Sequence, residues 1–149
     1  MNDFDFLVGT WDSTQRRLRK RLVGSDDWEV FSGHSVGYRL FDGAANVDEI
    51  TFPTLGQRGL SLRLYDPSTE LWSIYWAVPG VLFPPVTGRF DEHGVGEFFG
   101  EEEQDGRPVL VRFRWSDITA STARWQQAFS VDGGENWETN WVMDFHRSE

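Results

Sequence analysis

The stretch TARWQQAFSVDGGENWETNWVMDFHR (residues 122–147) alternates apolar and polar residues on both sides of a short Asp-Gly-Gly turn. Alternation with a period of two is typical of a β-strand that buries one face. The side chains that share one face are Ala123, Trp125, Gln127 and Phe129 before the turn, and Trp137, Thr139, Trp141, Met143 and Phe145 after it. We therefore expect an antiparallel hairpin with one face inward and the other in water.

The same alternation recurs along most of the chain. It is clear in residues 60–65, 71–78 and 109–115, and weaker between residues 10 and 52 and between 85 and 101. In the first of these segments Leu60, Leu62 and Leu64 share one face, opposite Ser61, Arg63 and Tyr65. Clusters of Gly, Pro and Asp separate the segments, and none of the connections is long enough for the crossover helix that parallel strands require. The pattern predicts an all-β fold of about ten antiparallel strands, each joined to the next by a hairpin.

A sheet of about ten strands is more stable when it closes on itself than when it stays open. An open sheet of that size would expose long edges, and closing the sheet removes them. We therefore expect a single antiparallel up-and-down β-barrel, with a two-sheet sandwich as the alternative. Residues 3–7 are expected to form a short N-terminal helical turn, because Asp3 can cap it and Phe4 and Leu7 lie three apart. No shift in composition marks a domain boundary, so we expect one barrel domain over residues 1–149.

Composition excludes several classes of function. The chain has 149 residues and a formal net charge of −10, which argues against nucleic acid as a partner because phosphates need a cationic face. It contains no Cys, which excludes disulfides, thiolate metal sites and a cysteine nucleophile. The longest apolar run, residues 77–86, is interrupted by Pro and Gly. We expect no membrane span and no signal peptide, and the cytoplasm is the expected location.

The N-terminal segment Phe6-Leu7-Val8-Gly9-Thr10-Trp11 resembles the Gly-X-Trp signature of the lipocalin and calycin superfamily. The resemblance implies that Trp11 closes one end of the barrel and that an Arg from the last strand packs across its ring. Arg147 shares the inward face of that strand and is the expected partner, in a contact worth about 0.5–2 kcal/mol. Segments 4–11, 46–49, 71–76 and 137–141 also resemble uncharacterised bacterial calycin-like proteins of nitrobindin-like architecture, a resemblance that brings no known reaction.

Residues 130–137 (SVDGGENW) resemble the Asp-box of sialidase-type propellers. In those proteins the box is a structural hairpin away from the active site. A propeller would need repeated copies of the box, and the chain has one. We therefore interpret the segment as a stable turn between the last two strands, in which Asp132 accepts hydrogen bonds from turn amides.

Aromatic residues give the main functional signal. The chain has eight Trp and 12 Phe, and most of the Trp fall on faces that can point inward. A barrel of about ten strands is wide enough to leave a cavity, and an aromatic lining with few polar groups suits a flat apolar molecule. We therefore expect the protein to bind a hydrophobic or aromatic small molecule. The residues expected to line its site are Tyr38, Trp76, Phe113, Trp125, Gln127, Trp141 and Met143.

A small-molecule enzyme of the isomerase or cyclase type is the alternative use of the same cavity. Asp48 shares parity with the apolar residues of its strand, which would turn its carboxylate inward. Paired with Arg17 or Arg89 this carboxylate is structural, whereas left unpaired it is a candidate general acid or base. The candidate catalytic residues are Asp48, Glu49, His34 and Tyr38. A shift of one residue in the register around residues 46–52 would make Glu49 the inward carboxylate in place of Asp48.

A haem protein is a further alternative. Nitrobindin-like calycins bind haem through one His near the C-terminus, and the resemblance implies His146 for that role. Alternation opposes it, because His146 lies on the face opposite Trp141 and Phe145 and would point outward. The three His residues, His34, His93 and His146, have no metal-ligand spacing, so we expect neither a metal nor a cofactor.

Two further segments are expected at the barrel ends. The basic run of residues 16–21 carries five of the 14 cations, and we interpret it as an exposed strand and hairpin whose cations face acidic neighbours. A clamp for an anionic ligand is the alternative. The apolar residues Val81, Leu82 and Phe83 would be costly to expose, so their loop is expected to cover the cavity or to form a homodimer contact.

Overall fold

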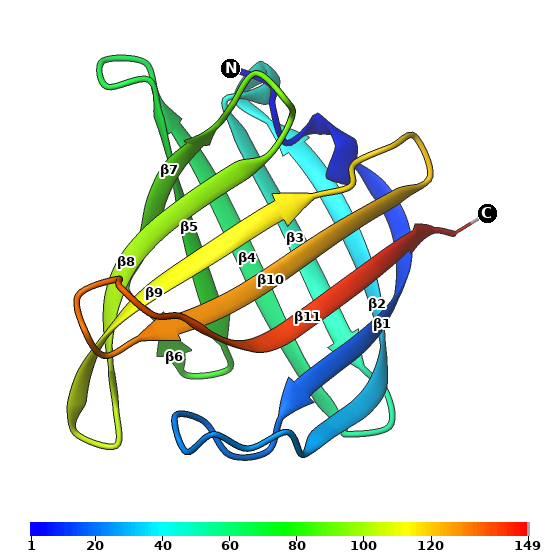
Figure 1. The fold of residues 1–149 in the computed structure, drawn as a ribbon. Coiled ribbons are helices and arrows are strands. Elements are labelled where there is room, and N and C mark those ends of the chain that lie inside the picture. Colours follow the sequence, from blue (N-terminus) through cyan, green and yellow to red (C-terminus); the bar gives the residue numbers. More distant parts are fainter. Residues whose placement is uncertain (149) are drawn as a thin grey trace.

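The computed structural model describes residues 1–148, which form a closed antiparallel β-barrel (Figure 1). Ten strands make the wall, and the two-residue strand β6 extends one hairpin. The strands are β1 (Gly9–Leu18), β2 (Trp28–Leu40), β3 (Ala45–Phe52), β4 (Gln57–Asp66), β5 (Leu71–Val78), β6 (Val81–Leu82), β7 (Val86–Phe90), β8 (Gly96–Gln104), β9 (Arg107–Ser116), β10 (Thr122–Ser130) and β11 (Glu138–Arg147). Helical structure within the described residues comprises two 3-10 turns, η1 (Asp5–Leu7) and η2 (Phe41–Gly43), and no helix there is long and apolar enough to cross a membrane.

Strands that are neighbours in the sequence are neighbours in the wall. The pairing runs from β1 through β5 and from β7 through β11, and β5 joins the two halves by pairing with β7. The barrel closes where β1 pairs with β11, in a register that places Trp11 opposite Arg147. The predicted up-and-down barrel of about ten strands is therefore confirmed, and the two-sheet sandwich is not the fold.

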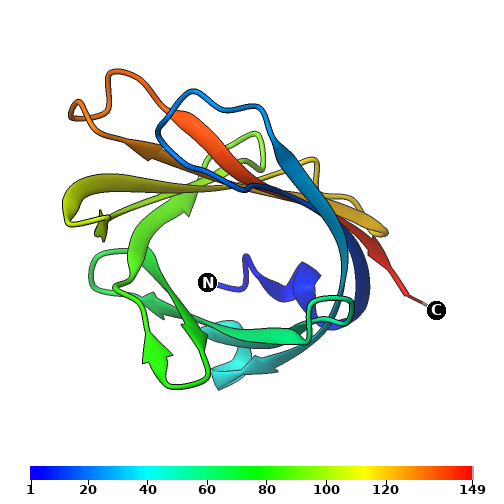
Figure 2. The same cartoon turned by 90° about the horizontal axis from the view of Figure 1, so that it is seen from below.

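The N-terminal segment lies inside the ring of strands, at one end of the barrel (Figure 2). It forms the predicted helical turn, η1, but Asp3 does not cap it. The Asp3 carboxylate instead accepts a hydrogen bond from the indole Nε1 of Trp72, at 2.9 Å. The Phe4 ring is buried, with its centroid 4.9 Å from that of Trp72 in an edge-to-face contact. This segment, the N-terminal plug (residues 3–7), fills one end of the bore.

Glycine on β2 makes room for the plug. A Cβ at Gly37 would overlap the carbonyl oxygen of Leu7, so no larger residue fits at this position without moving the plug. The inward face of β2 accordingly carries small residues next to one phenyl ring, and comprises Phe31, Gly33, Ser35 and Gly37. The other large apolar residues of β2, such as Val30 and Tyr38, lie on its outer face.

Strand β4 alternates as predicted but turns its polar face inward. Leu60 is 42% exposed on the outside, whereas Arg63 is 3% exposed on the inside. Gly59 lies on the same inward face beneath the indole of Trp76, which a Cβ at this position would overlap. Side-chain apolarity alone would turn the leucine face of β4 inward. The hydrogen bonds of Arg63 to Asn46 and Asp48 inside the barrel turn the polar face inward instead.

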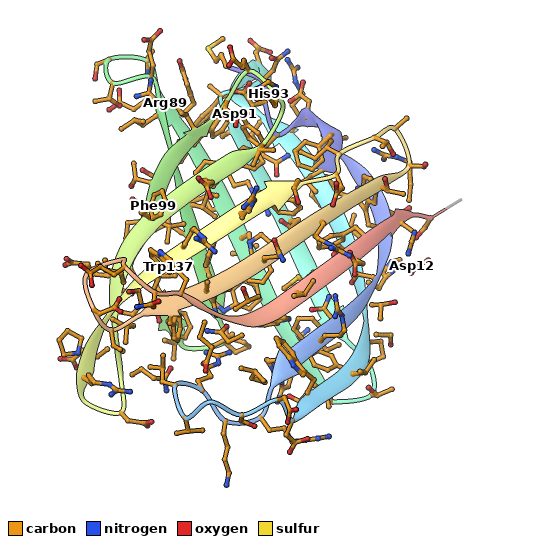
Figure 3. The ribbon with its side chains drawn as sticks, viewed as in Figure 1. Asp12, Arg89, Asp91, His93, Phe99 and Trp137 are labelled. Carbon is orange, nitrogen blue, oxygen red and sulfur yellow. The ribbon has the colours of Figure 1, made fainter. Side chains whose placement is uncertain are left out.

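Asp132 ties together the turn between β10 and β11. The carboxylate accepts hydrogen bonds from the Asn136 backbone N–H at 2.9 Å, the Asn136 side-chain amide at 2.8 Å and the Ser130 hydroxyl at 2.7 Å. These bonds lower the pKa of Asp132 from 3.8 to about 2. Trp137 completes the turn by donating from Nε1 to the Gly134 carbonyl, and its ring lies against Phe99 on the outside of the barrel (Figure 3). The predicted stable turn held by Asp132 is confirmed.

The lowered pKa of Asp132 leads to a pH-dependent prediction. Because its folded value lies below its unfolded value, ionised Asp132 stabilises the fold fully above pH 3.8, and this contribution is lost as the pH falls toward 2. Asp132→Asn should therefore lower the urea midpoint by a constant amount near neutral pH, and this difference should shrink as the pH is lowered from about 4. Asp26→Asn, in an exposed loop, is the control and should change little at any pH. A difference for Asp132→Asn that persists undiminished at the acid end would contradict the assignment.

Candidate functional site

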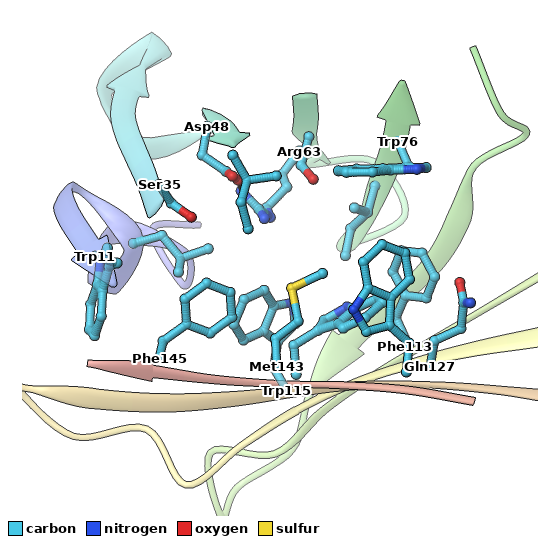
Figure 4. A pocket seen from close by; sticks show the side chains of 16 residues that line it. Trp11, Ser35, Asp48, Arg63, Trp76, Phe113, Trp115, Gln127, Met143 and Phe145 are labelled. Atoms are coloured by element: carbon cyan, nitrogen blue, oxygen red, sulfur yellow. Dashed lines mark hydrogen bonds and ion pairs between the residues drawn. The ribbon is translucent and has the colours of Figure 1, made fainter. Parts of the chain in front are cut away.

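A cavity lies in the bore between the N-terminal plug and the opposite end of the barrel. Its volume is about 50 Å³, which holds about three to five water molecules at roughly 10–15 Å³ each. Figure 4 shows that Ser35, Asp48 and Arg63 enter it from one wall, and that Met143 and Phe145 enter from the facing wall. The aromatic residues that line the cavity are Trp11, Trp76, Phe113, Trp115, Trp125, Trp141 and Phe145. One wall is therefore polar and the other is aromatic.

The polar wall is built around the buried guanidinium of Arg63. Its Nη1 donates to Asp48 Oδ1 at 2.6 Å and to Asn46 Oδ1 at 2.7 Å. The guanidinium carbon also lies 5.2 Å from the ring centroid of Phe4 and 5.6 Å from that of Trp115. Burying two charges is costly, and the short charge-assisted hydrogen bonds and the aromatic faces offset that cost. The cavity thus contains one ion pair with no net charge.

The predicted inward position of Asp48 is confirmed, but its partner is neither of the two cations considered from the sequence, Arg17 and Arg89. Arg17 pairs instead with Glu29 at 2.9 Å, and Arg89 is exposed on β7. Sequence reasoning missed Arg63 because it lies between leucines on a strand that apolarity orients the other way. The signal that could have identified it is the β3–β4 hairpin. Its register places Arg63 directly opposite Asn46, which lies two residues before Asp48.

The other interior amides bond to neighbouring side chains, except that Asn140 Nδ2 has no partner among the described residues. Gln15 donates to the Ser13 hydroxyl at 2.8 Å and accepts from the indole Nε1 of Trp141 at 2.7 Å. Gln127 donates from its amide to Asn140 Oδ1 at 2.8 Å, next to a bulge in the pairing of β10 with β11. These bonds fix the orientation of Trp141 and Gln127 in the wall of the cavity.

The structure brings most of the predicted ligand-binding residues to one place. Those that line the cavity are Trp76, Phe113, Trp125, Gln127, Trp141 and Met143, and the catalytic candidate Asp48 lines it too. The rings meet edge to face: centroids lie 5.0 Å apart for Phe113 and Trp125, and 5.6 Å apart for Trp125 and Trp141. Such contacts stabilise aromatic clusters and hold each ring in one orientation.

Three other candidates lie outside the barrel. Tyr38 is on the outer face of β2 and 57% exposed, and His34 shares that face, with its Nδ1 2.9 Å from Asp12 Oδ1. Glu49 is exposed on the outer face of β3. The prediction that Tyr38 and His34 face inward is wrong, because the plug requires the small-residue face of β2 inside. The alternative register that would turn Glu49 inward is not adopted.

His146 is exposed on the outer face of β11, directly across the strand pair from Asp12, which is labelled in Figure 3. This outward orientation is the one that alternation predicted, and it keeps His146 away from the cavity. Hydrogen bonds from His34 and from Ser148 hold the pKa of Asp12 below its usual range. Within residues 1–148, no group of three or more His, Asp or Glu side chains is arranged to hold a metal ion.

Arg147 and Trp11 lie together at the plugged end of the barrel. The guanidinium carbon of Arg147 is 4.2 Å from the centroid of the Trp11 ring. Its Nη1 donates to the Val8 carbonyl at 2.7 Å, its Nη2 to the Phe6 carbonyl at 2.8 Å and its Nε to the Ala120 carbonyl at 3.0 Å. One side chain of the last strand therefore binds the end of the plug and a turn of the wall at once.

Comparisons with known proteins bear on the fold. No protein-family model and no curated protein matches the chain. Among solved structures, the S-type phycobiliprotein lyase CPES from Guillardia theta is similar with a TM-score of 0.62 and 11% sequence identity, over 98% of this chain and 90% of that chain. The fold is calycin-like. The resemblance to nitrobindin-like bacterial proteins stays a prediction.

The end of the calycin-like barrel away from the plug carries an open groove of about 550 Å³. Trp76 and Trp141 line both this groove and the cavity, and their rings meet edge to face with centroids 6.1 Å apart. The two indoles therefore separate the cavity from the groove. A molecule that enters the cavity from this end must pass them.

The two segments expected at the barrel ends do not line the cavity. In the basic run, Arg16 pairs with Asp144 at 3.7 Å and Arg19 with Asp27 at 2.8 Å, so its cations face acidic neighbours as interpreted. The β5–β6 hairpin holds Val81 and Leu82 outside, where Leu82 is 69% exposed. This hairpin does not cover the cavity, and a homodimer contact through it stays a prediction.

The buried ion pair leads to a prediction about stability. Arg63→Met leaves the Asp48 carboxylate buried without its cation and should lower the free energy of unfolding by about 3–5 kcal/mol. The double variant Arg63→Met with Asp48→Leu removes both charges and should lose less than the single variant. Arg19→Met, which breaks an exposed pair, is the control and should cost about 1 kcal/mol or less. Urea unfolding measures all three, and a double variant less stable than Arg63→Met would contradict the assignment.

Proposed function

We propose that the protein binds a small hydrophobic or aromatic molecule in the cavity of its barrel. The observation that supports this most directly is the cavity itself, an interior space walled by indole and phenyl rings around one neutral ion pair. Predominantly apolar lining with a few fixed polar groups is the usual character of small-molecule sites. The rings are held in defined orientations by their mutual edge-to-face contacts.

The size of the cavity limits the ligand. The cavity volume of about 50 Å³ is smaller than the roughly 150 Å³ of an apolar cavity that binds benzene. A one-ring ligand therefore requires Trp76 or Trp141 to rotate toward the groove. The plug, Trp11 and Arg147 close the other end, so this proposal places ligand entry at the groove.

Binding is better supported than catalysis. A general acid or base must exchange a proton, and the Asp48 carboxylate is held at 2.6 Å in an ion pair with the buried guanidinium of Arg63. The other catalytic candidates, His34, Tyr38 and Glu49, face away from the cavity and cannot assist there. The similar phycobiliprotein lyase is named as an enzyme, but at 11% identity it shares the fold alone.

The proposal predicts that filling the cavity abolishes binding. Ser61 lines the cavity, and Ser61→Leu should occupy the space of a one-ring ligand. Binding of toluene, followed by the fluorescence of the interior Trp residues and by the NMR shifts of their indole N–H groups, should weaken at least about tenfold, which is roughly 1.4 kcal/mol. Ser32→Leu places the same side chain on the outer face of β2 and should leave binding unchanged. Equal affinity of the two variants, or no binding to the wild type, would overturn the proposal.

A further inference from the structure

The polar wall of the cavity contains hydrogen-bond donors that have no partner. Both side-chain hydrogen bonds of the Arg63 guanidinium run through Nη1, and its Nε finds no partner among the described residues. The hydroxyl of Ser35 finds none there either. Arg63 is 3% exposed and Ser35 is 4% exposed, so neither is a surface group that bulk water satisfies. Buried donors are rarely left unpaired, because each one costs its full desolvation.

These donors converge on one region of the cavity. In Figure 4, Ser35 and Arg63 flank Asp48, and all three project toward the space in front of Met143 and Phe145. A molecule in that space would have its flat face on the aromatic wall and one edge against the polar wall. The edge that faces Arg63 and Ser35 would need to accept hydrogen bonds.

The charge of the ligand follows from the charges already present. Asp48 neutralises Arg63, so a carboxylate on the ligand would leave an excess negative charge in a buried cavity beside Asp48. The net charge of −10 on the whole chain opposes an anion further. A cationic ligand would meet the guanidinium of Arg63. An uncharged ligand avoids both penalties.

We infer that the ligand is an uncharged one-ring aromatic compound with a carbonyl oxygen, which accepts hydrogen bonds from the Arg63 guanidinium and the Ser35 hydroxyl. This inference rests on the proposed function and specifies the ligand class of the same cavity. Ser35 and Arg63 select the oxygen, while the aromatic wall binds the ring without regard to the substituent.

Acetophenone and ethylbenzene test this inference, because they differ in a single oxygen. Ser35→Ala removes a hydroxyl that has no partner in the fold, so it should fold as the wild type does. It should weaken acetophenone binding about five- to tenfold, the value of one hydrogen bond, and leave ethylbenzene binding unchanged. Arg63→Lys keeps a cation beside Asp48, removes the guanidinium Nε and should have the same selective effect. Ser32→Ala, on the outer face, should alter neither.

Affinities are to be measured by NMR titration of the indole N–H groups, with benzoate as the charged probe. Loss of affinity for acetophenone alone in Ser35→Ala and Arg63→Lys supports the inference. An equal effect on acetophenone and ethylbenzene, or no effect on either, overturns the inference while the proposed function stands, since both probes then bind without recognition of the oxygen. Tighter binding of benzoate than of acetophenone by the wild type also overturns it. Absence of binding by all three probes overturns the proposed function and the inference together.

Discussion

The pairing of β1 with β11 is the contact on which the rest of the structure depends. It joins the first strand of the wall to the last and pairs backbone groups that two open edges would expose. It also sets the register that lays Arg147 over Trp11, and Arg147 in turn binds the carbonyls of the plug. The barrel therefore has one closed end and one end where two indoles separate the interior from an open groove.

The sequence predicts the barrel and its aromatic wall well, and the polar wall poorly. In β9, β10 and β11 one face is far richer in large apolar side chains, so alternation alone orients Trp125, Trp141 and Met143 correctly. In β2 and β4 both faces offer apolar residues, and contacts distant in sequence decide the orientation. Gly37 must face inward because Leu7 of the plug lies against it. Arg63 faces inward because it donates hydrogen bonds to Asp48 and Asn46 inside the barrel. No local pattern in either strand encodes those partners.

The Arg63–Asp48 pair is a local exception to the apolar interior. A buried ion pair commonly gains no more stability than apolar residues of the same volume would give, since desolvation of both charges opposes their attraction. Here three interactions reduce that cost: the bond to Asp48, the bond to Asn46 and the faces of two aromatic rings. Each charge is tolerated only because the other is present, so the two residues act as one neutral polar unit.

Several buried donors around the cavity have no hydrogen-bond partner among the described residues. A barrel selected for stability would pair the Ser35 hydroxyl and the Arg63 Nε, or replace them with apolar atoms, since either change removes a desolvation cost. The glutamines nearby follow that rule, because Gln15 and Gln127 are bonded to other side chains. Among the described residues, the buried side-chain atoms without a partner are Ser35 Oγ, Arg63 Nε, Trp11 Nε1, Trp115 Nε1 and Asn140 Nδ2, and all of these residues except Asn140 line the cavity. Local violations of this kind are expected where a fold reserves polar groups for a partner, and in the proposed complex the Ser35 and Arg63 donors face the carbonyl oxygen of the ligand.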